Sequence, residues 1–226
     1  MMMKTSETNT VDAQQIRELK RLVAEGEGTH LEFKRKAAYP EKIVRELIAF
    51  ANTEGGTLLV GVDDDKTIPG TKYPDEEAHV IIQALGQYCR PHITYKETII
   101  PISEKKFIVR FDIPPSTKRP HFLVLDKDTR SCFVREQDMS IKASAEMEEI
   151  VRRSRRARDI RFTFGDAEKQ LMEYLDTHKT ITLPAFQKLT HLNRFKARRK
   201  LILLVLANVL KITATEKGDL YARLWK

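Results

Sequence analysis

Residues 41–65 constrain the fold more than any other part of the chain. EKIVRELIAFAN (41–52) has apolar residues at 43, 44, 47, 48, 50 and 51, which is more than one narrow stripe and predicts a largely buried helix. It ends at NTEGG, and TLLVGV (57–62) follows as a continuous apolar run, typical of a central strand covered on both faces. A buried helix that turns directly into a buried strand predicts an α/β or α+β domain.

Further helices and strands are expected on both sides of this segment. VDAQQIRELKRLVA (11–24) has apolar residues at helical spacing, and THLEFKRK (29–36) predicts a short strand. DEEAHVIIQALGQYC (75–89) predicts another helix, because acids suit the first turn of a helix. The next pieces predict strands of a mixed sheet joined by hairpins: ITYKETIIPI, KKFIVRFDIP, PHFLVL and SCFVRE.

The last third of the chain has the layout of a second domain. Residues 143–158 begin as an acid-rich helix and finish in a basic run, so we expect a first domain at 11–150 and a basic connecting helix or linker at 151–163. Residues 164–226 then give helix, helix, helix, strand, strand, with a short turn between the second and third helices. That order predicts a winged helix-turn-helix domain.

The charge of the chain is divided unevenly between these regions. Residues 151–226 hold 18 Lys and Arg against 7 Asp and Glu, a net charge of +11, whereas residues 1–150 hold 22 against 25, a net charge of −3. A compact basic module most often binds a polyanion, so DNA or RNA is the expected partner. The alternatives are a solvated basic face without a ligand, or a module for dimerisation or protein docking.

The helix expected at 193–210 has the division of a recognition helix, with cations first and apolar residues after them. Asn193 can cap it, and Leu201 to Leu210 supply the buried end. In the following hairpin, the alternation of apolar and polar residues predicts which side chains face the core and which face solvent. Those expected to face the core are Leu210, Ile212, Ala214, Leu220, Ala222 and Leu224, and those expected to face solvent are Lys211, Lys217, Tyr221 and Arg223. The residues predicted to contact nucleic acid are Arg194, Lys196, Arg198, Arg199 and Lys200 on the helix, and Lys217, Tyr221 and Arg223 on the hairpin.

Three acids, Asp63, Asp64 and Asp65, follow the buried strand directly. One interpretation is turn chemistry, because Asp side chains bond nearby backbone N–H groups. The other is a divalent-metal site for Mg²⁺ or Mn²⁺, with Glu27 and Glu32 as further ligands if 30–34 pairs beside 57–62. Lys34 completes an E-x-K tripeptide resembling that of metal-dependent nucleases, although here it precedes the aspartates. The catalytic candidates are Glu27, Glu32, Lys34, Asp63 and Asp64, and the metal candidates are Glu27, Glu32, Asp63 and Asp64.

GEGTHLEFKRK, AFANTEGGTLLVGVDDD with Gly70 following IP, and CFVREQDMSIKAS together resemble the Schlafen AlbA-like domain over roughly residues 15–150. The resemblance implies a divergent AAA-type, DNA-binding or ATP-binding transcriptional regulator, often with a C-terminal winged helix. For the eukaryotic members it implies RNA cleavage by a metal-binding trio, here Glu27, Glu32 and one aspartate among 63–65. Nuclease members pair two such domains in one chain, whereas this chain has one copy.

Other functional classes find less support in the sequence. No apolar stretch reaches the ~20 residues of a membrane span, and LILLVLANVL (201–210) fits a buried helix better. The absence of a secretory signal and the presence of two cysteines, Cys89 and Cys132, favour a reduced, cytoplasmic setting. Regulators with a winged helix usually act as dimers on two half-sites, so we expect a homodimer.

Nucleotide and cofactor motifs are also missing from the sequence. No G-x-x-x-x-G-K-[ST] loop supports ATP binding, and Gly55-Gly56 precedes a strand, whereas phosphates prefer a glycine loop that leads into a helix. Gly55 and Gly56 fit a helix stop and tight turn better. The six histidines show no metal-ligand spacing. No cofactor is required by this interpretation, apart from Mg²⁺ or Mn²⁺ in the nuclease alternative.

Overall fold

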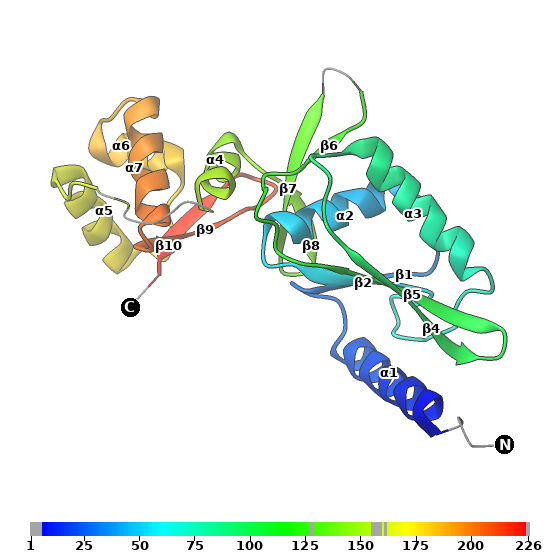
Figure 1. Ribbon diagram of the computed structural model, residues 1–226. Helices are drawn as coiled ribbons and strands as arrows, with labels where there is room; N and C mark the ends of the chain where they lie inside the picture. The colour runs from blue at the N-terminus through cyan, green and yellow to red at the C-terminus, as the bar shows by residue number, and fades with distance from the viewer. Residues whose placement is uncertain (1–5, 127–128, 155–159, 161, 225–226) are drawn as a thin grey trace. The chain divides into compact units, whose positions relative to one another are not determined.

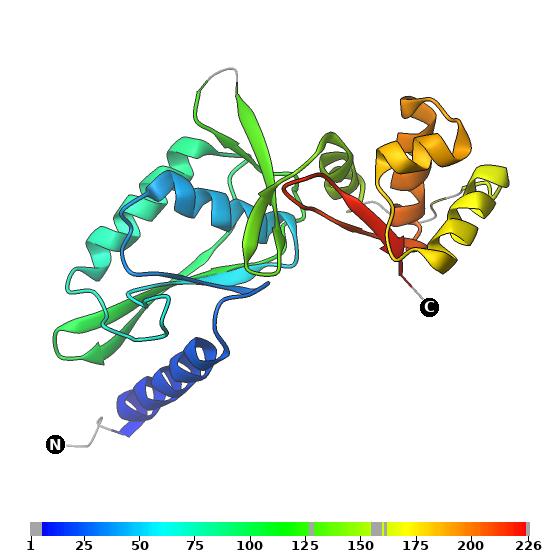
Figure 2. The ribbon, with the colours of Figure 1, turned by 180° about the vertical axis from the view of Figure 1, so that it is seen from behind.

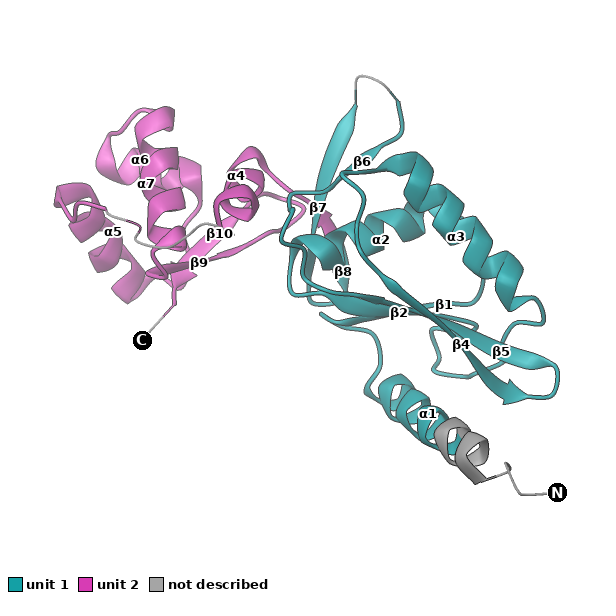
Figure 3. Ribbon diagram, in the orientation of Figure 1, with its two compact units in different colours: residues 1–140 teal, residues 141–226 magenta. Residues whose placement is uncertain are grey.

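The computed structural model describes residues 6–126, 129–154, 160 and 162–224, without the side chains of 6–12. The chain divides into two compact units, unit 1 at residues 1–140 and unit 2 at 141–226, each with its own hydrophobic core (Figure 3). The division falls ten residues before the boundary expected at 150. The expected connecting segment 151–163 overlaps the end of a helix of unit 2, and its residues 155–159 and 161 lie outside the described residues.

Unit 1 is built on a mixed four-stranded sheet. A mixed sheet was predicted, but PHFLVL and SCFVRE, which were expected in it, form part of a separate sheet. The order of the four-stranded sheet is β1 (Leu31–Lys34), β2 (Gly56–Val60), β5 (Lys106–Ile113) and β4 (Lys96–Ser103). β1 runs parallel to β2, with Glu32 opposite Leu58, while β5 is antiparallel to both of its neighbours. The pairing of β1 beside β2 confirms the arrangement on which the acidic-site hypothesis depends.

A second sheet completes unit 1. It contains β3 (Cys89–Arg90), β6 (Phe122–Val124), β7 (Arg130–Glu136) and β8 (Met139–Lys142), in the order β3-β6-β7-β8. The division between the units falls inside β8. Asn52, at the end of the helix before β2, bonds through its side chain to the backbone of His121 and Phe133, and so fixes this sheet to the helix.

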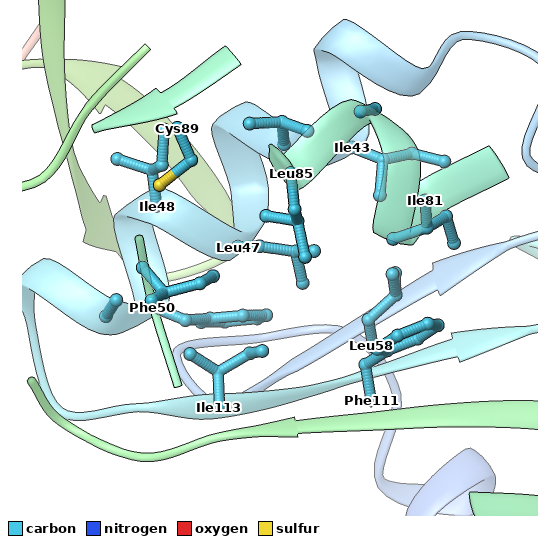
Figure 4. Close-up of a cluster of buried hydrophobic side chains, with 14 of the residues drawn as sticks. Ile43, Leu47, Ile48, Phe50, Leu58, Ile81, Leu85, Cys89, Phe111 and Ile113 are labelled. Carbon is cyan, nitrogen blue, oxygen red and sulfur yellow. The ribbon is translucent and has the colours of Figure 1, made fainter. Parts of the chain in front are cut away.

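Helices cover both faces of the four-stranded sheet. α2 (Pro40–Asn52) and α3 (Pro74–Tyr88) lie on one side and α1 (Ser6–Glu25) on the other, as Figures 1 and 2 show. Leu47 and Phe50 of α2 pack with Leu58 and Phe111 of the sheet (Figure 4). On the opposite face, Leu19 of α1 belongs to a second cluster of buried apolar side chains. The prediction of a largely buried helix at 41–52 and a strand buried on both faces is confirmed.

The glycine pair between α2 and β2 is explained by packing and backbone geometry. Gly55 has a φ of +80°, and a Cβ there would lie 2.6 Å from the carbonyl oxygen of Ile113. A Cβ on Gly56 would lie 2.5 Å from the ring of Phe50. Gly55 is therefore required by its positive φ and by its close approach to the end of β5, and Gly56 by the close approach of α2 to β2.

Unit 2 consists of helices followed by a hairpin. After α4 (Ala145–Ser154) come α5 (Asp166–Thr177), α6 (Leu183–Thr190), α7 (Arg194–Leu206) and the antiparallel strands β9 (Leu210–Thr213) and β10 (Leu220–Arg223). Asn193 caps α7, because its Oδ1 accepts a hydrogen bond of 2.9 Å from the backbone N–H of Lys196. The order helix, helix, helix, strand, strand expected for 164–226 is present.

α4 belongs to unit 2 because it packs on α7. Ile150 of α4 shares a buried cluster with Ile202 and Leu206 of α7. The sequence-based boundary missed this contact, since α4 looked like the end of the first domain. Among the helices of the described residues, none is both long enough and apolar enough to cross a membrane.

Candidate functional site

The three aspartates after β2 lie in a turn that their own side chains stabilise. The backbone N–H of Asp63 donates to the carbonyl of Thr67, and Oδ1 of Asp65 accepts from both the N–H and the hydroxyl of Thr67. These bonds lower the pKa of Asp65. Asp63 also lies 3.3 Å from Nε of Arg35. Turn chemistry thus accounts for Asp63 and Asp65 but not for Asp64, which is exposed.

Glu27 folds back along β1 and faces the same end of the sheet. An antiparallel bridge joins Gly28 and Leu31, and Oε1 of Glu27 accepts a 2.7 Å hydrogen bond from the N–H of Phe33. Partial burial of the carboxyl group raises its pKa most, and the charges of Glu32 and Asp64 raise it further.

Glu32 is buried and already neutralised by basic partners. Its Oε2 accepts a 2.7 Å hydrogen bond from Nη2 of Arg135, and its Oε1 accepts one from Nζ of Lys34. Arg135 has a fully buried side chain and also bonds Glu46 at 3.0 Å and the carbonyl of Gly28. Buried carboxylates are tolerated when paired in this way.

The acidic candidates therefore share one edge of the sheet without forming a closed metal cage. In the part of the chain that the structure describes, no group of three His, Cys, Asp or Glu side chains is arranged to hold a metal ion. The carboxylate of Glu27 accepts from the N–H of Phe33, while Glu32 is paired with Arg135 and Lys34. Lys34 is thus a partner of Glu32. Sequence reasoning did not single out Arg135 and Glu46. Arg135 lies in the segment CFVREQDMSIKAS that carried the family resemblance, but nothing in the sequence paired it with Glu32 or Glu46.

On unit 2, the predicted cations of α7 differ in how they are engaged. Arg198 lies 3.0 Å and Arg194 3.8 Å from Oε1 of Glu146 in α4, and Lys200 lies 2.5 Å from Oε1 of Glu168 in α5. Lys196 and Arg199 are exposed, and no acidic side chain among the described residues pairs with either. Phe195, between the cations, is 71% exposed.

The hairpin departs from the predicted alternation on its second strand. Tyr221, expected to face outward and to contact nucleic acid, is fully buried with Phe186 and Leu201, so that assignment was wrong. Its backbone bonds both ways to Ile181, which brings the ring into the core. Leu220 and Ala222 are partly exposed, and Leu224 is 39% exposed.

The remaining wing residues lie on the surface of unit 2. Arg223 forms an ion pair with Asp176 of α5. Lys217 is exposed in the turn between β9 and β10, and its ammonium group pairs with no acidic side chain among the described residues. Of the hairpin candidates, Lys217 is thus the most accessible to a ligand.

Unit 1 defines the class of the protein: an α+β domain with a mixed sheet between helices and a carboxylate-bearing edge. The sequence matches the family described as Schlafen, AlbA_2 over residues 27–144, more than half of the chain, and the protein belongs to this family. The family expected from the sequence is thereby confirmed.

Two solved structures are similar at low sequence identity. One is the N-terminal domain of a protein from Nitrosomonas europaea described as related to the ATP-dependent DNA helicase RecG; identity is 20%, the match covers 52% of this chain and 87% of that one, and the TM-score is 0.41. The other is the DIP2311 protein from Corynebacterium diphtheriae, with 15% identity, coverage of 96% of this chain and 39% of that one, and a TM-score of 0.46. This chain therefore spans about two fifths of the DIP2311 chain.

Proposed function

We propose that the protein binds nucleic acid and acts as a DNA-binding transcriptional regulator, with unit 2 as a winged helix and the start of α7 as its recognition helix. The observation that carries the proposal is the pair Lys196 and Arg199, exposed and without an acidic partner among the described residues. Spaced three residues apart, they lie on one side of α7. Membership in the Schlafen AlbA_2 family supports a nucleic-acid-associated role.

The packing of α7 supports this orientation. Its Ala197, Leu201 and Leu204 are buried with α5 and α6, while Ile202 and Leu206 pack on α4. These contacts leave the side with Lys196 and Arg199 for a ligand. Residues 141–226 carry 19 Lys and Arg against 10 Asp and Glu, a net charge of +9, whereas residues 1–140 carry 21 against 22. The positive potential that would attract a phosphate backbone is thus concentrated on unit 2.

The expected contributions of the five cations of α7 are unequal. Arg198 and Lys200 are held in ion pairs with buried carboxylates, and each would have to leave its pair to reach a phosphate. Lys196 and Arg199 need no such exchange. We also propose a homodimer, since a helix that reads one half-site gains specificity when a two-fold partner reads the next.

The test is binding of a short labelled DNA duplex, measured by fluorescence anisotropy from about 50 to 200 mM salt. The double variant Lys196→Gln with Arg199→Gln is expected to weaken binding about tenfold or more. The slope of log K against log salt concentration should become shallower by about 2, because each lost phosphate contact removes about 0.9 from it. The matched control, Lys169→Gln with Lys179→Gln, removes the same charge from exposed positions of unit 2 outside α7. Equal losses in both double variants would refute the recognition-helix assignment.

A second candidate function is a Mg²⁺- or Mn²⁺-dependent nuclease at the acidic edge of unit 1. The specific observation in its favour is that β1 pairs in parallel with β2, the strand that leads to Asp64, while Glu27 is bonded back onto the N–H of Phe33 in β1, which also carries Glu32. Carboxylates of this kind would hold the metal, which would supply an activated water as nucleophile. Glu32 would take part only if it exchanged Arg135 or Lys34 for the cation.

The nuclease candidate is tested by incubating RNA and single-stranded DNA with the protein and Mn²⁺. Glu27→Gln and Asp64→Asn are expected to abolish cleavage, whereas Glu104→Gln, an exposed acid in the turn between β4 and β5, should leave it unchanged. If the wild type cleaves neither substrate, the nuclease candidate is refuted and only the binding function remains. If the protein shows no cleavage and no salt-sensitive binding, the result points to a protein-interaction module.

A further inference from the structure

Unit 2 contains a cavity of about 390 Å³ beside α7. Lys196, Arg199 and Lys200 line it from one side of the helix, and Phe162, which precedes α5, lines it from another segment. Leu203 adds an apolar wall and Glu168 a carboxylate. Volumes of about 300–1,000 Å³ with apolar walls and a few converging polar groups are typical of small-molecule sites.

The charges around this cavity do not cancel. Glu168 is 2% exposed, and both of its oxygens are engaged, because one accepts from Lys200 at 2.5 Å and the other from the N–H of Gly165 at 3.1 Å. Its single negative charge is therefore matched by Lys200. Lys196 and Arg199 remain as two cations on the cavity wall with no acidic partner among the described residues. A site with this surplus favours an anion.

The types of the lining residues narrow the chemistry of that anion. The planar guanidinium of Arg199 can donate two parallel hydrogen bonds to a phosphate, and the ammonium of Lys196 can add a further donor. Phe162 and Leu203 offer apolar contact to a flat ring. We propose that the cavity binds a small phosphate monoester that carries an aromatic base, a nucleoside monophosphate being the simplest member of this class.

Such a ligand would regulate the function proposed above, and this second part of the inference rests on that function. Lys196 and Arg199 belong both to the cavity wall and to the surface proposed for DNA. A bound phosphate would occupy their donors, so ligand and nucleic acid would compete. The phosphate that binds Lys196 and Arg199 could belong to a free nucleotide or to the nucleic-acid backbone. Measuring the binding of the free nucleotide in the absence of nucleic acid distinguishes the two.

The experiment is calorimetric titration of the full chain with AMP, adenosine and inorganic phosphate as probes. AMP is expected to bind best, phosphate more weakly and adenosine not measurably. Arg199→Gln should weaken AMP binding about tenfold or more, Phe162→Leu should weaken AMP binding but not phosphate binding, and Lys179→Gln, an exposed lysine outside the cavity, should change neither.

The proposal is overturned if AMP fails to bind the wild type, or if Arg199→Gln and Lys179→Gln bind it equally. Circular dichroism of Arg199→Gln shows whether the variant is folded, and Arg199→Lys, which retains the charge but loses the fork, gives a second measure of the same contact. DNA binding without AMP binding would refute the proposed nucleotide site and leave the proposed function standing. AMP binding without DNA binding would refute the proposed function and leave the cavity standing.

Discussion

Arg135 and Glu32 stand 103 residues apart in the sequence and form a buried ion pair, with Nη2 of the arginine 2.7 Å from Oε2 of the glutamate. The same guanidinium reaches Glu46 of α2 through Nη1 and the carbonyl groups of Gly28 and Leu31 through Nη2. β7, β1 and α2 are thereby joined by one side chain. The glutamate singled out from the sequence as a catalytic candidate has a clear structural role at the junction of these elements.

Removing the cation of this junction should destabilise unit 1 strongly. Arg135→Met keeps most of the side-chain volume but leaves Glu32 and Glu46 buried near each other without their shared partner, and we expect a loss of about 3–5 kcal/mol in the free energy of unfolding. Urea denaturation measures it. Arg21→Met, which breaks an exposed pair with Glu25, should cost less than about 1 kcal/mol. Similar small losses in both variants would contradict the central role of Arg135.

Glu27 should make the stability of the fold depend on pH. Its folded-state pKa is raised, so the ionised form is disfavoured in the folded protein, and stability declines as pH rises from the unfolded value of 4.5 through the folded value. Glu27→Gln removes this cost and retains an oxygen for the N–H of Phe33. The variant should be more stable than the wild type at pH 7, with a smaller difference below pH 4.5. Urea denaturation at both pH values checks this, and a pH-independent difference would contradict it.

Tyr221 gives a prediction that separates a structural role from a binding role. Its ring is fully buried, and its hydroxyl has no hydrogen-bond partner within the described part of the chain. Tyr221→Phe removes a buried unsatisfied group and should leave stability unchanged or raise it by about 1 kcal/mol, without effect on DNA binding. Tyr221→Ala should cost about 3–5 kcal/mol. Thermal denaturation and anisotropy measure the two effects, and weaker DNA binding by a stable Tyr221→Phe protein would restore the assignment made from the sequence.

The comparison of Tyr221 with α2 shows what the sequence could and could not predict. The buried α2, the strand β2 and the glycine turn depend on residues close together in the chain, and all three were predicted. Tyrosine has an apolar ring and a polar tip, so its direction in β10 depended on the backbone pairing with Ile181, which no local pattern reveals. Arg135, the buried partner of Glu32, comes from β7, and Glu146, the partner of Arg198, comes from α4. Contacts between such distant elements require the fold itself.

The glycines of unit 1 should respond to alanine in opposite ways. At Gly56 a Cβ would lie 2.5 Å from the Phe50 ring, and Gly56→Ala should destabilise the fold by about 1–3 kcal/mol through overpacking. Gly86 lies in α3 with nothing within 4 Å of a Cβ, so Gly86→Ala should stabilise by about 0.5–1 kcal/mol through helix propensity. Thermal unfolding of the two variants compares them directly. A tolerated Gly56→Ala would contradict the close contact between α2 and β2.

Glu146 should restrain nucleic-acid binding by unit 2, if α7 is the recognition helix. Glu146 of α4 is 7% exposed, and its carboxylate lies near the guanidinium groups of both Arg194 and Arg198. Its negative charge therefore partly neutralises both cations. Glu146→Gln retains hydrogen-bonding oxygen but removes the charge, and we expect tighter DNA binding by about two- to tenfold with a steeper salt slope. Glu149→Gln, which loses an ion pair with Arg152 of the same helix, is the matched control. Anisotropy titrations of both variants over a range of salt concentrations measure the effect. Unchanged or weaker binding by a folded Glu146→Gln protein would show that Arg194 and Arg198 do not face the nucleic acid. The contacts from α7 would then depend on its unpaired cations, Lys196 and Arg199.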